Sequence, residues 1–255
     1  MKIGVVGLGL IGGSIFKKLK QNPKYDVVGV STTVTESNVS SDYSILKSCD
    51  LVFVCTPMKV VLDVLEKLET YLSSATIVSD VCSLKGFVSK RKYIYNFIPS
   101  HPMAGTENSG WESSFPELFN KAKWVITPID GEINQKQKDL ESVISDLGAE
   151  VVITTPEEHD RAVALISHMP MLLAQAMCMN IKNNKLAQIL ASTGFKDTTR
   201  LALSNTQMAS DMIELNSVNI KSAINSLNTC VSNLLNENYQ TKINDIKQFR
   251  QNLYS

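Results

Sequence analysis

The chain has 255 residues, of which 44% are hydrophobic and 20% are charged, and its 25 basic side chains balance 25 acidic ones. This length and apolar content are enough for one large domain or two ordinary ones with real cores. A net charge of zero argues against a nucleic-acid-binding surface, which needs an excess of basic side chains. The five cysteines lack paired or zinc-finger spacing, so we expect no metal site, no disulfide framework and a cytoplasmic location.

The first half of the chain alternates short runs rich in valine and isoleucine with amphipathic segments. The apolar runs predict strands over residues 2–8, 26–31, 50–56, 75–81, 96–100, 123–129 and 150–155. Apolar residues at helical spacing predict helices over residues 12–22, 59–72 and 134–148. Strand–helix alternation implies right-handed crossovers, so we predict an α/β domain with a mostly parallel sheet over residues 1–155.

A glycine-rich turn, GLGLIG, directly follows the first predicted strand and opens the first predicted helix. Gly7 permits the tight turn, Gly9 lets the backbone approach a pyrophosphate, and Gly12 allows the helix and the strand to pack closely. The phosphates then meet N–H groups at the helix N-terminus, where Leu10 and Ile11 lie. The turn predicts a Rossmann dinucleotide-binding domain, because a glycine motif between a strand and a helix is more specific than the glycine motif alone.

The second predicted strand ends in three hydroxyl side chains, Ser31, Thr32 and Thr33, where NAD enzymes usually carry an acidic residue. No carboxylate is present there to repel the 2′-phosphate of NADP, and the hydroxyls could donate hydrogen bonds to it. The arginine that commonly clamps this phosphate is also missing. We therefore expect NADP to be used at least as well as NAD.

Further contacts to the cofactor are expected at the carboxyl ends of the next two strands, because ligands bind at that edge of a parallel sheet. The predicted residues are Cys55, Thr56, Pro57 and Asp80. Ser83 and Lys85 follow Asp80 closely in the segment SDVCSLKG. A hydroxyl at this edge could orient a catalytic imidazole or the alcohol of a substrate.

One of only three histidines, His101, stands before a proline in SHPMAGTENSGWESSFPELF, after a predicted strand. We expect Pro102 to stiffen a turn there, and Gly105 and Gly110 to let the backbone bend. A dehydrogenase needs an acceptor for the proton that leaves a hydroxyl, and the near-neutral pKa of histidine suits that role. The alternative is a histidine that simply hydrogen-bonds a turn.

The second half of the chain, residues 156–255, is predicted to be a helical domain. In TPEEHDRAVALISHM, Thr155 can cap a helix, Pro156 fits its first turn, and two glutamates suit its positive end. The stretch 162–179 is apolar enough to suggest a membrane span, but polar residues and a proline interrupt it. We therefore expect a buried helix and no membrane segment.

The tail, residues 206–255, is amphipathic and predicts a long helical seam. The seam consists of Ile213, Ile220, Ile224, Leu227, Val231 and Leu234. Its length exceeds what a small domain can cover, so a second subunit is one expected partner. A helix that lies on its own domain explains the pattern equally well.

Between these helices, the segment STGFKDTTR gathers Lys196, Asp197 and Arg200 after Gly194, which breaks the helical pattern. Such a segment is either a solvated loop or a clamp for a carboxylate, because arginine offers a two-pronged charged donor. His168, beside a proline in an apolar helix, would by itself be interpreted as a core histidine.

Taken together and in this order, these motifs resemble the prephenate/arogenate dehydrogenases of tyrosine biosynthesis. The resemblance covers most of the chain up to about residue 216, and the HPMAGTE and GFKDTTR blocks are its most specific parts. It implies a Rossmann domain followed by an all-helical domain that forms an intertwined homodimer. It also implies the NAD(P)-dependent oxidation of the ring alcohol of a cyclohexadienyl acid, with loss of the ring carboxylate as carbon dioxide.

The resemblance further implies a role for single residues. His101 matches the histidine that accepts the proton of the ring hydroxyl, and Ser83 matches the serine that orients it. The resemblance implies that Arg200, Glu107 and His168 bind substrate, and the interpretation of STGFKDTTR as a carboxylate clamp adds Lys196 to these residues. A second histidine of the family pattern is replaced by Met171, which leaves the choice between prephenate and arogenate open, with prephenate narrowly favoured.

Two other classes of function remain compatible with the residues. One is a different dehydrogenase with the same two-domain plan, such as a β-hydroxyacid or imine-reducing enzyme, which would not need the His101 and Arg200 blocks together. The other is a non-catalytic sensor that binds NADP(H) and signals through its helical half. Such a sensor would bind the cofactor without turning over either cyclohexadienyl acid.

Overall fold

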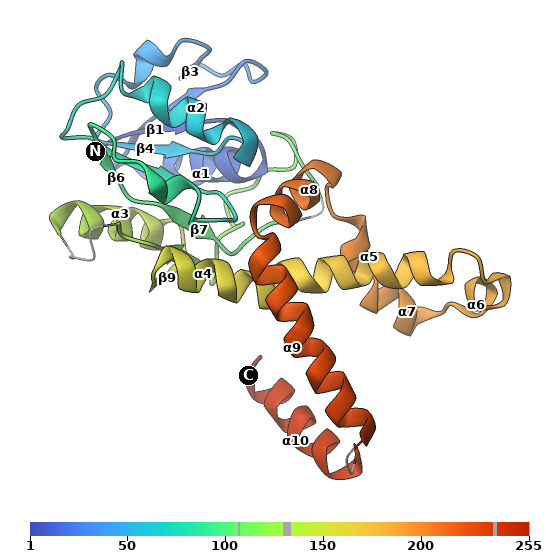
Figure 1. Ribbon diagram of the computed structural model, residues 1–255. Coiled ribbons are helices and arrows are strands. Elements are labelled where there is room, and N and C mark those ends of the chain that lie inside the picture. The colour runs from blue at the N-terminus through green and yellow to red at the C-terminus, as the bar shows by residue number, and fades with distance from the viewer. Residues whose placement is uncertain (107, 130–133, 237–238, 255) are drawn as a thin grey trace.

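The computed structural model describes residues 1–106, 108–129, 134–236 and 239–254. An α/β body forms the N-terminal part, and helices project from it in two directions (Figure 1). The elements of the body are β1 (Lys2–Val6), α1 (Leu10–Lys20), β2 (Asp26–Val30), β3 (Val39–Ser40), β4 (Leu51–Val54), α2 (Met58–Leu68), β5 (Ile77–Asp80), β6 (Asn96–Phe97), β7 (Ser100–Pro102), β8 (Lys123–Ile126), α3 (Gln135–Asp146) and β9 (Glu150–Ile153).

Six parallel strands form the main sheet, in the order β3-β2-β1-β4-β5-β6. This is the strand order of a dinucleotide-binding fold, and it confirms the predicted fold class. Alternate residues of the central strands enter two separate cores: Val52 of β4 packs on the side of α2, and Phe53 packs on the side of α1 and α3. Burial on both faces explains why these strands are continuously apolar.

A second sheet carries His101, and here the structure differs from the prediction. The segment 96–100 is not one strand: β6 ends at Phe97, and β7 begins at Ser100 in a three-stranded sheet of order β7-β8-β9. Pro99, between them, has no N–H for a ladder hydrogen bond, so pairing with the main sheet stops there. β7 pairs antiparallel with β8, which places His101 opposite Val125 in a strand and not in a turn.

The C-terminal part is helical from Pro156 onward. Its elements are α4 (Pro156–Val163), a π-helical turn (Ala164–His168), α5 (Met169–Ile181), α6 (Lys185–Leu190), α7 (Thr193–Thr198), a 3₁₀ turn (Arg200–Leu203), α8 (Thr206–Leu215), α9 (Ser217–Asn236) and α10 (Tyr239–Asn252). Thr155 caps α4 as predicted, because its hydroxyl accepts a hydrogen bond from the Glu158 N–H at 3.2 Å. Pro170 lacks the N–H that would continue the α-helical ladder, which is consistent with the π-helical turn just before it.

Two expectations for the helical part are wrong in detail. The tail is not one helix: α8 ends at Leu215, α9 starts at Ser217, and α10 folds back against α9. Asn216 makes the break, since its side chain bonds elsewhere in the core. Gly194 does not interrupt a helix either, because it lies inside α7.

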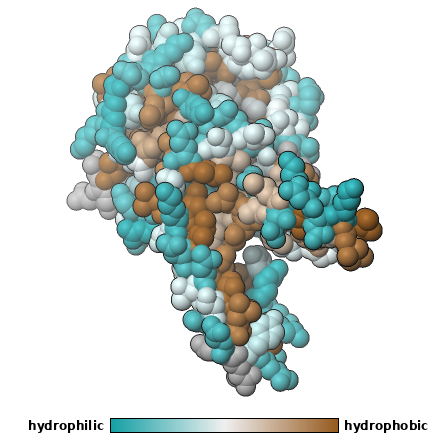
Figure 2. Space-filling view, turned by 45° about the vertical axis from the view of Figure 1, so that its right-hand side comes forward, coloured by the Kyte–Doolittle hydropathy of each residue, from teal (hydrophilic) through white to brown (hydrophobic). Residues whose placement is uncertain are grey.

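The apolar helix expected to be buried is largely exposed in the single chain. Residues Pro156–Ile181 form one continuous helical segment that is long and apolar enough to cross a membrane by length and composition alone, yet only 28% of its most apolar window is buried. Figure 2 shows apolar side chains gathered below the α/β body and along the projecting helices. They include Ile166, Met179, Ile189, Leu203, Val218 and Leu235, each more than half exposed. An exposed apolar surface of this kind is typical of a site that binds another protein or a membrane.

Candidate active site

The glycine-rich turn has the geometry that its sequence predicts. Gly7 has a φ of +88°, and an added Cβ there would lie 2.7 Å from the carbonyl oxygen of Cys55. A Cβ at Gly12 would lie 2.0 Å from the carbonyl oxygen of Gly7, so α1 and the turn touch through that position. At Gly9 a Cβ would meet no atom within 4 Å. Gly9 therefore borders open space, into which a phosphate group can approach the backbone.

Several unused polar groups surround this turn. The start of α1 has no side-chain cap, because its N-cap residue is Gly9. The buried hydroxyl oxygen of Thr56, after β4, has no hydrogen-bond partner within the described part of the chain. Ser31 Oγ accepts the N–H groups of Thr33 and Val34, both at 3.2 Å, and lies 3.4 Å from Thr33 Oγ1, so one proton of this hydroxyl pair is left for a ligand. These residues fit a dinucleotide, whose phosphates and ribose supply the missing partners.

Asp80 was expected to contact the cofactor, but its carboxylate is bonded to groups within the protein. Its side chain is fully buried and forms an ion pair with Lys85, whose side chain is fully buried too. The carboxylate also accepts hydrogen bonds from the N–H of Cys82 at 2.9 Å and of Ser100 at 3.3 Å. Lys85 Nζ in turn donates to the carbonyl oxygen of Ser100 at 2.5 Å. The pair therefore anchors β7, and with it His101, to the carboxyl end of β5.

All three histidines of the chain lie in one connected network. His101 Nδ1 is 2.9 Å from Nε2 of His159, and His159 Nδ1 is 2.8 Å from Oδ1 of Asp160. Asp160 is held by the backbone N–H groups of Lys85 and Gly86, both at 2.8 Å. Sequence reasoning missed His159, because its partner lies 58 residues away. The adjacent histidine and aspartate in the first turn of a helix were the available signal.

His168 joins the network through Asn216. Asn216 Nδ2 donates to the carbonyl oxygen of Asp160 at 2.9 Å and lies 3.1 Å from Nδ1 of His168. Burial lowers the pKa of His168 to about 4. Burial, reinforced by His159, Lys85 and His168, also holds the pKa of His101 well below its ordinary value. His101 is therefore neutral near pH 7, as a proton acceptor must be.

The segment after His101 docks on the helix that follows the glycine-rich turn. Lys17 of α1 donates to the carbonyl oxygens of Trp111 and Ser114, at 3.2 and 2.9 Å, and lies over the Trp111 ring. A Cβ at Gly13 would lie 2.5 Å from Ser114 Oγ, so only glycine admits this contact. The second glycine of the GG pair thus joins the predicted cofactor turn to the His101 block.

The other residues predicted for the site are not hydrogen-bonded to the histidine network within the described part of the chain. Ser83 lies half-buried in the loop that Asp160 holds, and no described residue hydrogen-bonds its hydroxyl. Arg200 and Lys196 are exposed, on the 3₁₀ turn and on α7, and within the described residues no hydrogen bond or ion pair joins them to the histidines. Glu107 lies outside the described residues. Met171, where the family pattern has histidine, is 4% exposed in the hydrophobic core.

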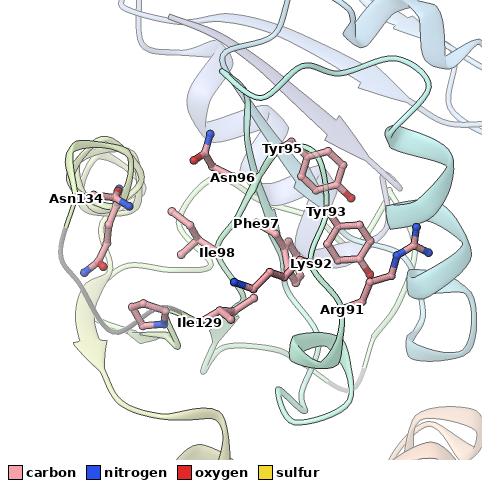
Figure 3. A pocket seen from close by; sticks show the side chains of 11 residues that line it. Arg91, Lys92, Tyr93, Tyr95, Asn96, Phe97, Ile98, Ile129 and Asn134 are labelled. Carbon is pink, nitrogen blue, oxygen red and sulfur yellow. The ribbon is translucent and has the colours of Figure 1, made fainter.

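A cavity elsewhere on the α/β body does not overlap these residues. It lies beside the edge strand β6, between the loop after Lys90 and the start of α3 (Figure 3). Tyr93, Phe97, Ile98 and Asn134 are among its lining residues. The histidine network and the glycine-rich turn contribute none of its walls, so the candidate active site is a separate place at the carboxyl edge of the sheet.

Comparison with known proteins assigns both parts of the chain. Residues 19–153 match the family model described as "Prephenate dehydrogenase, nucleotide-binding domain". Residues 155–252 match "Prephenate dehydrogenase, dimerization domain". A prephenate dehydrogenase from Bacillus subtilis is 29% identical over 82% of this chain, and the chain spans 62% of that relative's length.

Solved structures agree with this assignment. An arogenate dehydrogenase from Synechocystis is 31% identical, with a TM-score of 0.84 and coverage of 99% of this chain and 97% of that one. A prephenate dehydrogenase from A. aeolicus, solved with hydroxyphenyl propionate and NAD⁺, has the same fold, with a TM-score of 0.88 at 24% identity over 99% and 98% of the two chains. The predicted resemblance is confirmed, and the chain belongs to the prephenate dehydrogenase family.

Proposed function

We propose that the chain is an NAD(P)-dependent prephenate dehydrogenase that converts prephenate to 4-hydroxyphenylpyruvate by oxidation and decarboxylation. The observation that carries this proposal is the neutral, largely buried His101, which the ion pair of Asp80 and Lys85 holds at the carboxyl edge of the sheet. The glycine-rich turn opens at the same edge. A proton acceptor and a dinucleotide site at one edge are what oxidation of an alcohol requires.

The cofactor is proposed to lie along the turn from Gly7 to Gly12, with Leu10 and Ile11 supplying N–H groups at the start of α1. Thr56, between Cys55 and Pro57, offers its unpaired hydroxyl. When bound, the nicotinamide supplies the acceptor for the hydride. The proposed use of NADP at least as well as NAD rests on the exposed hydroxyls of Thr32 and Thr33 and the absence of a carboxylate beside them. Steady-state kinetics with both cofactors test this, and a large preference for NAD would contradict it.

In the proposed mechanism, His101 accepts the proton of the ring hydroxyl, and Ser83 orients that hydroxyl. The free hydroxyl of Ser83 supports this role, because no described residue already uses it. Aromatisation of the ring drives the loss of the carboxylate, so the protein must mainly position the substrate and accept one proton. The burial that depresses the pKa of His101 keeps its ring in the neutral form that can accept the proton.

Substrate carboxylates are proposed to bind Arg200 and Lys196, with Glu107 at the mouth of the site and His168 behind it. Arg200 and Lys196 are exposed on a part of the helical surface that a second chain would help to enclose. Arogenate is the alternative substrate, and one observation favours it: Met171 is buried in the core and offers no hydrogen bond to the keto group of prephenate. Relative kcat/KM values for the two acids decide between them.

We further propose a cytoplasmic homodimer, with a cofactor domain at residues 1–155 and a substrate and dimerisation domain at residues 156–255. The exposed apolar surface along α5 and α9 supports a second copy as the covering partner. The alternative partner for such a helix is a bilayer. Light scattering with and without lipid vesicles separates them, because a dimer has twice the chain mass and stays free of vesicles.

The direct test of the proposed chemistry is His101→Asn. Loss of general base catalysis lowers kcat by roughly 10²–10⁴-fold. The affinity for NADP should stay within about threefold, because His101 is not among the groups proposed to hold the cofactor. A variant with nearly unchanged kcat would refute the assignment of His101 as the proton acceptor. Binding of NADP with no turnover of either acid by the unmodified chain would instead support a sensor.

A further inference from the structure

We propose that Asp160 and His159 act as positioning residues that keep the ring proton of His101 on Nδ1, so that Nε2 presents its lone pair to the substrate hydroxyl. This inference deepens the proposed function and rests on it, because both concern the same histidine. Its evidence is independent of any ligand, since it consists of the hydrogen bonds that connect three residues from β7 and α4.

The network begins at a carboxylate that is able only to accept. Oδ1 of Asp160 accepts the N–H of Lys85, and Oδ2 accepts the N–H of Gly86. An added Cβ at Gly86 would lie 2.9 Å from Oδ2, so glycine is what lets the carboxylate come so close. Because Oδ1 also lies 2.8 Å from Nδ1 of His159, that nitrogen must carry a proton and donate it.

The hydrogen bond between His159 and His101 determines which nitrogen of His101 carries the ring proton. In a neutral imidazole only one nitrogen carries the proton, so Nε2 of His159 has a free lone pair. It lies 2.9 Å from Nδ1 of His101 and accepts a hydrogen bond from it. The partner of one ring nitrogen decides which tautomer a histidine adopts. His101 is therefore protonated on Nδ1, and its Nε2 is left as an acceptor.

The charges around His101 explain why a negative group connected to its ring favours proton transfer. When the O–H bond of the substrate breaks, its electron pair stays on oxygen, a new N–H bond forms at Nε2 of His101, and the ring becomes positive. Burial, the ring of His159, the ammonium of Lys85 and the ring of His168 all oppose that charge. Asp80 offsets Lys85, and Asp160, connected through His159, is the negative group that stabilises the charged ring. The loop at Lys85 and helix α4 thus contribute opposing charges to the site.

A matched pair of variants separates this role from simple packing. In His159→Gln, the amide oxygen can still accept from His101 Nδ1, whereas His159→Leu removes the acceptor. We expect kcat to fall roughly 10²–10³-fold in H159L, as when a triad histidine loses its orienting partner. H159Q should recover at least about tenfold of that loss, while the NADP affinity of both stays within about threefold of the parent. Equal losses in the two variants, or a loss below about threefold in H159L, would overturn the inference.

A spectroscopic measurement on the unmodified protein keeps the inference testable if a variant fails to fold. Nitrogen NMR of protein labelled only at histidine shows three rings, which His101→Asn and His159→Gln assign. The expected result at neutral pH is a proton on Nδ1 and a bare Nε2 in both His101 and His159. A proton on Nε2 of His101, or a doubly protonated His159, would overturn the inference.

The two measurements also separate this inference from the proposed function. Protons on Nδ1 in a chain that oxidises neither acid would refute the proposed function and support the tautomer assignment. Turnover by a chain whose His101 is protonated on Nε2 would refute the tautomer assignment alone.

Discussion

Replacing Lys85 by methionine tests how the protein holds His101 in place. The ammonium of Lys85 and the carboxylate of Asp80 are both fully buried, and Lys85 also donates to the carbonyl oxygen of Ser100. Methionine nearly conserves the volume but leaves the carboxylate buried without its cation. Breaking a buried pair in this way costs about 3–5 kcal/mol of unfolding free energy.

The same position offers two controls. Lys20 pairs with Glu36 at 3.3 Å, but both side chains are more than a third exposed, so Lys20→Met should cost at most about 1 kcal/mol. Adding Asp80→Asn to Lys85→Met removes the unpaired charge and should restore about 2 kcal/mol, since the amide oxygen still accepts one backbone N–H.

Urea unfolding followed by tryptophan fluorescence measures these differences at one fixed protein concentration. Trp124 is a suitable reporter, because it is fully buried and its Nε1 donates to Ser100 Oγ at 2.9 Å. If Lys85→Met costs no more than Lys20→Met, the ion pair does not anchor β7 and the reasoning fails.

Three further predictions concern the cofactor turn, the buried histidine and the exposed helices. Gly9→Ala should leave the free energy of unfolding unchanged, because its Cβ meets only open space in the protein, but it should weaken NADP binding by at least about tenfold. Gly12→Ala should lower the free energy of unfolding by about 2 kcal/mol or more, because its Cβ would lie 2.0 Å from the carbonyl oxygen of Gly7. Equal stability of the two variants would contradict this. The pKa of His168 is about 4 in the folded chain, against an ordinary value of 6.5. As the pH falls, His168 therefore takes up its proton in the unfolded chain first, and the free energy of unfolding should decrease by roughly 3 kcal/mol between pH 6.5 and pH 4. His168→Gln should flatten that slope in urea titrations, and an unchanged slope would count against it. Leu235→Lys, at a residue 80% exposed, should raise the dimer dissociation constant at least about tenfold in sedimentation experiments, and an unaltered constant would remove α9 from the interface.

The sequence was sufficient to predict the elements that depend on local pattern. Runs rich in valine and isoleucine located β1, β2, β4 and β5, because strands buried on both faces are mostly apolar. The glycine-rich turn was predictable as well, since Gly7 and Gly12 meet specific steric demands and Gly9 borders open space. These features depend on neighbours within a few residues or on a fixed steric rule.

What could not be predicted depends on distant partners. The strand at His101 leaves the main sheet at Pro99 and pairs with β8, which the apolar pattern does not reveal. Asp80 was interpreted as a cofactor contact, and only the fold shows that Lys85 turns inward to pair with it. His159 reaches His101 across 58 residues, so nothing local to either residue announces the contact.

The central claim is that His101 and the glycine-rich turn together oxidise a cyclohexadienyl acid. The most direct test mixes purified protein with NADP⁺ or NAD⁺ and with prephenate or arogenate, and follows reduced cofactor and released carbon dioxide together. The account predicts that both products appear in equal amounts with at least one acid, and that neither appears at a comparable rate with His101→Asn. Reduced cofactor without carbon dioxide, or no reduction with either acid, would contradict it.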